Sequence, residues 1–597
     1  MNRFSFLCYA SVCALLTACS SAPVSTPVIP SPRTTPALNT LAAQTDALKP
    51  QTRATLTSSE LTAVDINDSG IGAPQPLWDN ATQTEIIALL QAIERGYTSP
   101  TTQQIIARVL KAAAKAPPSQ TPPTDAAAFL GQRLQTLAST GNVTAAEELL
   151  NTIPRKDYTP SSWRMAVYLP FLKSDIKRGC AIHQEALEKA PENAPNIAKT
   201  IFLCQLASGN RAAAELSFGL LQEQATQGKV KDSFIELAAF GLEQSPKAPT
   251  LENPTLLQIT LLSLLQKDVP LVVQPTLNPT LFPRLATLPF LWSGTRIVAA
   301  EQAVSRNTLD VQTLLHLYRS EKFNENEWGT IDDTQALGKV AMDDPLPTGR
   351  ENALLWQKIQ RTKTLEEKLS LLKILTAFNA ENRSILAFAK VFYPLTFEVP
   401  LSKQFIFAAP TLVPLLLLAG DADRAGLWLT LLEIEERNGN AAATQVLTTL
   451  LPYYILQRSY AADTTNPQNV ARFNRWQQKN ILYGRVVTAY FSALGKKLPH
   501  GDTNADPLPL SMPALLASFD NPVVAEEMAT LHTGLVQSLN AGDKGKSLLL
   551  SVRLLQLVPL HYDNAVMQDV FRTLLKYGYD AEAKAIVYEM LALEWGN

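Results

Sequence analysis

Apolar residues recur at steps of three and four along most of this 597-residue chain, and a recurring glycine–alanine pair interrupts them. That period is typical of amphipathic helices, and strand-like alternation is almost absent. In each copy an apolar helix ends near the glycine, and a short polar turn leads to an alanine five residues later. The copies pair Gly141 with Ala146, Gly209 with Ala214, Gly420 with Ala425, and Gly578 with Ala583. The pattern predicts a series of helical hairpins.

Small residues are needed at these positions for steric reasons. Glycine adopts the left-handed conformation that ends a helix, and alanine lets the second helix approach its neighbour closely. The pattern resembles the tetratricopeptide-like (TPR-like) helix–turn–helix unit, in which glycine and alanine hold these relative positions. The resemblance implies an all-α fold, an irregular TPR-like α-solenoid of helical hairpins that follows a disordered N-terminal tether.

The copies depart from a regular repeat. Their spacing is irregular, and the aromatic and terminal proline positions of the TPR-like unit are not consistently filled. A further copy at Gly542 has Ser547 where the other copies have alanine. An ordinary irregular helical domain therefore stays open as the alternative to a solenoid.

The N-terminus has the features of an export signal. Arg3 precedes an apolar run from Phe4 to Leu16, which is too short to span a bilayer as a mature helix. The run ends in Leu-Thr-Ala-Cys, which resembles the bacterial lipobox and implies cleavage before Cys19 and lipid on its thiol. Ser20 follows in place of the aspartate associated with inner-membrane retention, so the resemblance implies an outer-membrane anchor facing the periplasm.

Composition shifts along the chain suggest its domain organisation. Residues 19–83 are rich in Ser, Thr, Pro and Ala without an apolar period, which predicts a disordered tether. Many prolines between 245 and 290 interrupt the helical pattern and suggest a hinge region. We therefore expect a signal peptide at 1–18, the tether at 19–83, N-terminal helical repeats at 84–244, the Pro-rich hinge at 245–290, central repeats at 291–500 and C-terminal repeats at 501–597.

Overall composition excludes some partners. Hydrophobic residues make up 46% of the chain and charged residues 18%, with a formal net charge of −2. Nucleic acid requires a clustered lysine and arginine surface, so we expect no nucleic-acid partner. Because no apolar stretch has the length of a spanning helix, membrane attachment is assigned to the N-terminal lipid.

The cysteine count leaves one pair in the mature body. Cys8 and Cys13 lie in the signal and Cys19 is assigned to lipid, so that Cys180 and Cys204 remain. Two cysteines in an oxidising compartment suggest a disulfide. Two buried free thiols are the alternative, since free cysteine packs as a small hydrophobic residue.

Two loops resemble ligand-binding motifs incompletely. Residues 541–547 resemble the end of a Walker phosphate loop, but Asn540 replaces its first glycine and the preceding segment reads as helix. Residues 65–70 resemble the first half of a calcium loop, but Pro76 stands where the bidentate glutamate belongs. We interpret the first as a turn between helices and the second as a solvated turn.

Other candidate features have simple structural explanations. Arg472, Trp476 and Lys479 share one face of an expected helix, which we interpret as a solvated face in preference to a contact for an acidic partner or a glycan. The apolar run from Phe405 to Ala419 contains two prolines and predicts a core helix. The five histidines are scattered, without zinc spacing.

No catalytic pattern emerges, so we expect no catalytic residue, no cofactor and no metal site. The expected function is that of a lipid-anchored, periplasm-facing scaffold or adaptor, which binds protein partners of an envelope assembly through a helical-repeat surface. The alternative is a peptidoglycan-associated enzyme or regulator of cell-wall synthesis, similar to the helical superstructure of soluble lytic transglycosylases. A deep cleft that holds a desolvated glutamate would favour this alternative.

Overall fold

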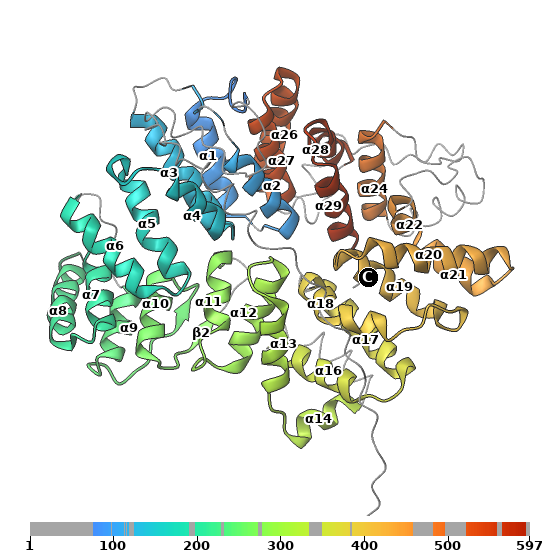
Figure 1. Cartoon of the computed structure of the whole chain (residues 1–597), viewed down its shortest axis with the longest axis horizontal. Helices are drawn as coiled ribbons and strands as arrows, with labels where there is room; N and C mark the ends of the chain where they lie inside the picture. The colour runs from blue at the N-terminus through green and yellow to red at the C-terminus, as the bar shows by residue number, and fades with distance from the viewer. Residues whose placement is uncertain are drawn as a thin grey trace, which may run out of the picture. The chain divides into compact units, whose positions relative to one another are not determined.

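The described part of the chain is all-helical apart from one pair of very short strands. A computed structural model (Figure 1) describes residues 76–592, except 97, 113, 115, 119–123, 190–196, 229–231, 273–276, 333–348, 382–384, 458–480, 496–520 and 558–563. All of these residues belong to one compact unit, Leu56–Asn597. The parallel strands β1 (Leu251–Glu252) and β2 (Leu271–Val272) pair Leu251 with Leu271. The predicted all-α class is therefore confirmed for the described residues.

The first helices follow one another with short connections, and consecutive members pack together from α3 to α8. They are α1 (Gln83–Glu94), α2 (Pro100–Lys111), α3 (Thr124–Ser139), α4 (Val143–Asn151), η3 (Arg155–Asp157), α5 (Pro160–Leu172), α6 (Ile176–Lys189), α7 (Ile197–Ala207), α8 (Arg211–Gly228) and α9 (Ser233–Gly241).

The central helices include the Pro-rich region, where prolines begin helices as well as interrupt them. Pro279 and Pro283 lie in the first turns of η5 and α11, where a missing backbone N–H costs nothing. The elements are α10 (Leu256–Leu265), η5 (Pro279–Leu281), α11 (Phe282–Ala286), α12 (Ser293–Ser305), α13 (Val311–Ser320), α14 (Glu325–Asp332), α16 (Arg350–Arg361), α17 (Leu365–Glu381) and α18 (Ile385–Phe392).

The last helices include the apolar run predicted as a core helix. Leu412, Val413, Leu415 and Leu416 of this run are fully buried, which confirms the prediction for α19. It is wrong for the start of the run, which forms the 3-10 helix η7 and leaves Phe407 53% exposed. The elements are η6 (Tyr393–Phe397), η7 (Lys403–Ala408), α19 (Ala409–Leu418), α20 (Ala422–Arg437), α21 (Ala441–Thr449), α22 (Leu451–Gln457), α24 (Ile481–Ala493), α26 (Pro522–Ala541), α27 (Lys544–Leu557), α28 (Asn564–Lys576) and α29 (Asp580–Ala592).

The glycine junctions adopt the conformation that the sequence pattern predicts. All four glycines have positive φ, with values of 98° at Gly141, 76° at Gly209, 90° at Gly420 and 78° at Gly578. The residue after each glycine donates its N–H to a carbonyl five residues back, as in Asn142 to Leu137 at 2.8 Å. The helices on either side contact one another, in the pairs α3–α4, α7–α8, α19–α20 and α28–α29. The predicted hairpins are confirmed.

The position five residues after the glycine is buried in every copy. Ala146, Ala214, Ala425 and Ala583 have no exposed surface. Ser547 in the α26–α27 junction is equally buried, and its hydroxyl donates to the Asp543 carbonyl at 2.6 Å. Because the hydroxyl is satisfied within its own helix, serine can replace alanine without leaving an unpaired polar group in the interface.

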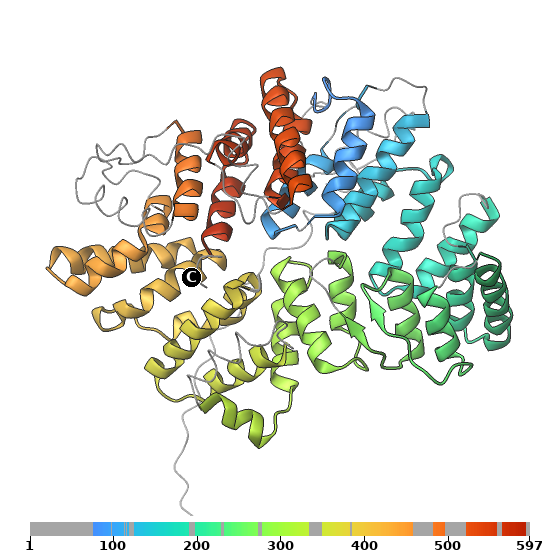
Figure 2. The ribbon, with the colours of Figure 1, turned by 180° about the vertical axis from the view of Figure 1, so that it is seen from behind.

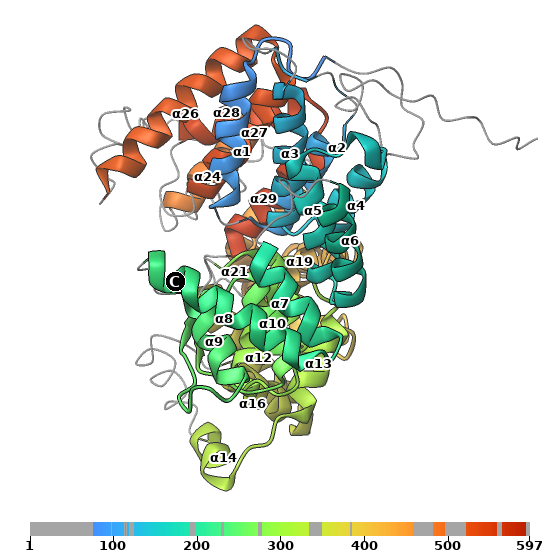
Figure 3. The same ribbon diagram turned by 90° about the vertical axis from the view of Figure 1, so that its left-hand side faces the viewer.

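The two ends of the described chain meet. Helices α1 and α2 contact α27, and α2 also contacts α29. Figure 1 shows α1 and α2 beside α26 and α27, and Figures 2 and 3 show the same neighbours from behind and from the side. We call these contacts between α1–α2, with the turn before them, and α26–α29 the seam.

The folded body begins earlier than the expected tether boundary at residue 83. Leu77, Trp78 and Ala81 are buried, and α1 itself begins at Gln83. The expectation that the tether extends to residue 83 is therefore wrong for residues 77–82. The cause is a long-range contact, since these residues pack against α27 from the other end of the chain.

Membrane-spanning potential can be judged only for the described helices. Among them none is both long enough and apolar enough to cross a bilayer.

Candidate functional site

One open pocket of about 470 Å³ lies where the α12–α13 connection meets α18, η6 and the end of α19. Its described lining consists of Asn307, Thr308, Leu309, Asp310, Val311, Lys390, Tyr393 and Ala419. Asp310 accepts the N–H of Gln312 and so caps the N-terminus of α13, while the Tyr393 hydroxyl donates to Asp421 at 2.9 Å. Most polar groups of the pocket are therefore already engaged in holding helix ends.

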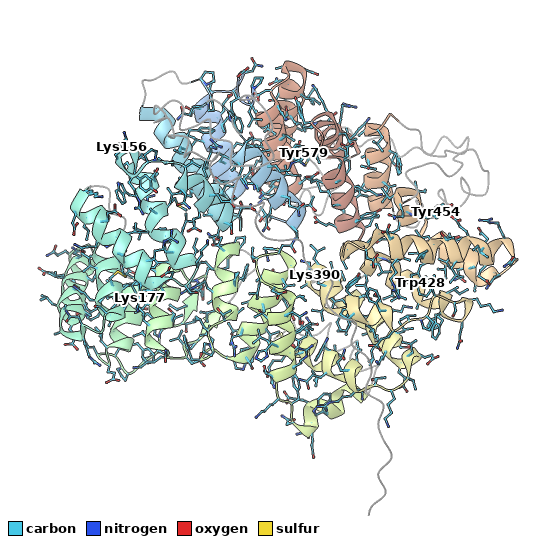
Figure 4. The ribbon with its side chains drawn as sticks, in the orientation of Figure 1. Lys156, Lys177, Lys390, Trp428, Tyr454 and Tyr579 are labelled. Atoms are coloured by element: carbon cyan, nitrogen blue, oxygen red, sulfur yellow. A yellow bond between two sulfur atoms is a disulfide. The ribbon has the colours of Figure 1, made fainter. Side chains whose placement is uncertain are left out.

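Lys390 is the cationic group of the described lining, and Figure 4 shows it on α18. Its Nζ donates to the Val304 carbonyl at 2.8 Å and also to the side chain of Asn307. The carbonyl belongs to the last turn of α12, where a cation is favoured by the helix dipole. Burial lowers the pKa of Lys390 from 10.5 to about 8, and the nearby Glu589 partly opposes this shift.

Asn307 explains the local geometry of the pocket. It has a φ of 56°, in the left-handed region, and the following Thr308 donates its N–H to the Ala303 carbonyl at 2.9 Å. This is the same helix ending that glycine makes at the hairpin junctions, with asparagine in its place. The asparagine side chain adds an acceptor for Lys390, which glycine would lack.

Glu589 ties α29 to the N-terminus of α2 across the seam. It accepts the Thr101 hydroxyl at 2.6 Å and the Thr101 N–H at 3.3 Å. Burial raises the pKa of Glu589, and its hydrogen bonds with Thr101 and Ser99 oppose the increase. The Glu589 carboxylate therefore lies at the first turn of α2, where the helix dipole favours an anion.

Two further side chains cross the seam. Arg108 of α2 pairs with Glu582 of α29, and its guanidinium lies over the ring of Tyr579, just before α29, 3.9 Å from the ring centre. Gln556 of α27 donates to the Ile93 carbonyl at the end of α1, at 2.9 Å. The seam is therefore held by specific polar contacts in addition to apolar packing.

A second buried glutamate lies within the helical array and outside the pocket. Glu301 of α12 accepts the Tyr318 hydroxyl at 2.6 Å and the Asn352 side-chain N–H at 3.0 Å. Burial raises its pKa from 4.5 to about 7, and the two hydrogen bonds oppose part of this shift. The carboxyl is enclosed between α12, α13 and α16, so it does not form the glutamate-containing cleft that would favour an enzyme.

The cysteine pair lies between two neighbouring helices. Cys180 of α6 and Cys204 of α7 form a disulfide in the structure, with Cα atoms 5.5 Å apart. The helices also contact one another directly. Cys19, the expected lipid site, lies outside the described residues, as do Arg472, Trp476, Lys479 and residues 65–70.

The Walker-like segment contains the predicted turn between helices at Gly542 and Asp543, and residues 544–547 form the first turn of α27. Gly542 ends α26 with a φ of 75°, and α27 begins at Lys544. The preceding element is a helix, and Lys546 pairs with Glu85 of α1 at 3.3 Å. No group of metal-binding side chains was found among the described residues.

Sequence reasoning missed the residues of the seam and the pocket. Trp78 stands within a segment that reads as tether, and Lys390 and Glu589 belong to no motif. One local signal was available: Thr82 and Glu85 form a capping box, which marks the start of α1. The apolar Leu77 and Trp78 just before such a box are candidates for packing against the first helix.

Protein-family models, curated protein sequences and solved structures all gave no match.

Proposed function

We propose that this chain is a lipid-anchored envelope scaffold, whose TPR-like helical array binds protein partners without catalysing a reaction. The observation that carries the proposal is the recurrence of one junction, a left-handed glycine followed by a buried small residue, from Gly141 to Gly578. Stacked hairpins of this kind present extended surfaces suited to protein binding. The lipobox ending at Cys19 supplies the proposed anchor.

The proposed binding face consists of exposed apolar side chains on the neighbouring elements η6, η7 and α20. Four large apolar side chains on these elements are about half exposed: Phe397, Phe407, Leu427 and Ile434. The three elements are neighbours, since η7 contacts α20 and the guanidinium of Arg424 on α20 lies 4.2 Å from the ring centre of Phe397 on η6. Large apolar side chains gathered on a surface are typical of protein interaction sites. We expect an envelope protein that presents apolar side chains to bind here.

Site-specific photo-crosslinking in cells tests this face. A photoreactive residue at Phe407 or Leu427 should capture the same protein, while one at Leu216 of α8, which is 72% exposed, should not. Equal capture from all three positions would contradict a specific face. Hydrolysis of purified peptidoglycan by the full chain would contradict the proposed absence of catalysis.

The anchor is tested separately. Cys19→Ala should abolish palmitate labelling and leave uncleaved precursor, because signal peptidase II cuts before the modified cysteine of a lipobox. Full labelling of the variant would refute the assignment of Cys19 as the anchor.

A further inference from the structure

The turn Leu77–Ala81, just before α1, is packed as core although it lies at the beginning of the described chain. Trp78 is 2% exposed, Leu77 and Ala81 are comparably buried, and the Ala81 N–H closes the turn on the Trp78 carbonyl at 3.2 Å. Burial of an indole and a leucine is strongly favourable. Some of the contacts that bury them come from α27, at the opposite end of the chain.

The receiving surface is the start of α27. The Gly545 N–H donates to the Leu77 carbonyl at 2.8 Å, and the Asn80 side chain donates to the Ala541 carbonyl at 3.1 Å. A Cβ on Gly545 would lie 2.4 Å from the Trp78 ring and 2.5 Å from the Leu77 carbonyl oxygen. Only glycine leaves room for this approach, which gives the second glycine of the Walker-like segment a structural role.

The indole also reaches the N-terminal helices. Trp78 packs edge-on against Phe129 of α3, with ring centres 5.8 Å apart. It therefore lies between α27 and α3, two helices that are far apart in sequence. The turn lies before the first residue of α1, Gln83, so its release would unwind no described helix.

We propose that the surface of α27 at Gly545 is a recognition site for a Leu-Trp turn, filled by the chain's own residues 77–81, and that this turn latches the seam. The inference does not depend on the proposed scaffold function or on the lipid anchor. Release of the latch frees α1 and α2 from α27 and α29 and leaves the site open to a peptide of the same chemistry.

Hydrogen exchange of the full chain tests the latch. Trp78→Ala should raise amide exchange at least about tenfold in α1, α2, α27 and α29 together, and leave α12 and α13 unchanged. Trp292→Ala is the control, because Trp292 is 50% exposed and lies outside the seam. Unchanged exchange in the seam of Trp78→Ala would overturn the proposal.

If Trp78→Ala raises amide exchange throughout the chain, a second variant distinguishes loss of the latch from general destabilisation. Gly545→Ala keeps the indole but crowds it, and should raise exchange in the seam alone. Gly219→Ala is its control, since a Cβ at this helical glycine meets no atom within 4 Å. If Gly545→Ala also destabilises the whole chain, the turn is ordinary core and the latch is refuted.

A peptide supplied in trans tests recognition directly. A synthetic peptide of residues 76–82 should restore slow exchange to α27 in Trp78→Ala, whereas the same peptide with alanine in place of tryptophan should not. Failure of the first peptide at millimolar concentration, or equal protection by both peptides, would overturn the recognition site.

Discussion

The glycine–alanine hairpin junctions depend on small residues of one short segment, whereas the seam between the chain's ends combines one glycine with large and polar side chains. At α19–α20 the contact depends on Gly420 and the buried Ala425, which belong to one short segment. At the seam it depends on Trp78 against Gly545 and on Glu589 with Thr101. Local junctions need only a permitted turn and close backbones, while a long-range contact needs side chains that identify the correct partner helix.

The largest effect should come from a buried tryptophan outside the seam. Trp428 of α20, labelled in Figure 4, has no exposed surface, so Trp428→Ala should lower the free energy of unfolding by about 3–5 kcal/mol. Exchange should rise around α19 and α20 and stay slow in α1 and α27. Leu427→Ala, at a neighbouring exposed position, is the control, with a change within about 0.5 kcal/mol. If the seam opens equally in Trp428→Ala, the two regions are not separate.

The α6–α7 pair is the junction that a covalent bond reinforces. Removing the Cys180–Cys204 bridge, which spans 24 residues, should cost about 3 kcal/mol in the chain-entropy model. Thiol titration of the purified, unfolded and unreduced mature chain should find no reactive thiol. Two reactive thiols would show that the exported protein lacks the bridge, and Cys180→Ser with Cys204→Ser would then have little effect on stability.

Glu301 tests whether a buried polar contact within the array behaves like those of the seam. Its pKa is raised from 4.5 to about 7, so the folded state holds the proton more tightly than the unfolded state. The free energy of unfolding should therefore fall as pH rises through this window, by about 2–3 kcal/mol. Glu301→Gln should remove this part of the pH dependence in urea unfolding. Parallel curves for both proteins would contradict the raised pKa.

The smallest expected changes in stability come from alanine substitutions at two glycines that both face open space. Gly420 has a φ of 90°, whereas Gly219 lies within helix α8, and a Cβ at either position meets no atom within 4 Å. Gly420→Ala should destabilise by about 1 kcal/mol because alanine disfavours the left-handed region. Gly219→Ala should stabilise by about 0.5–1 kcal/mol because alanine is the better helix former. Thermal unfolding should show shifts of opposite sign, and shifts of the same sign would contradict the assigned role of Gly420.

The same contrast explains how much the sequence could predict. The hairpins were predictable because Gly141 and Ala146, or Gly578 and Ala583, lie within one segment whose geometry they determine. The end of α12 was harder to recognise in the sequence, because Asn307 takes the place of the glycine there. Trp78 could not be assigned to the core, because its partner Gly545 lies at the other end of the chain and appeared to belong to an incomplete Walker loop. Lys390 and Glu589 are single charges whose surroundings only the fold creates.

Zero-length carbodiimide coupling tests most directly whether the ends of the chain meet. Lys546 and Glu85 lie 3.3 Å apart across the seam, and Lys111 and Glu148 lie 2.9 Å apart between α2 and α4, with similar exposure in both pairs. The account predicts that mass spectrometry of the coupled full-length monomer finds both crosslinked peptides in comparable yield. Coupling of Lys111 to Glu148 without coupling of Lys546 to Glu85 would contradict the seam.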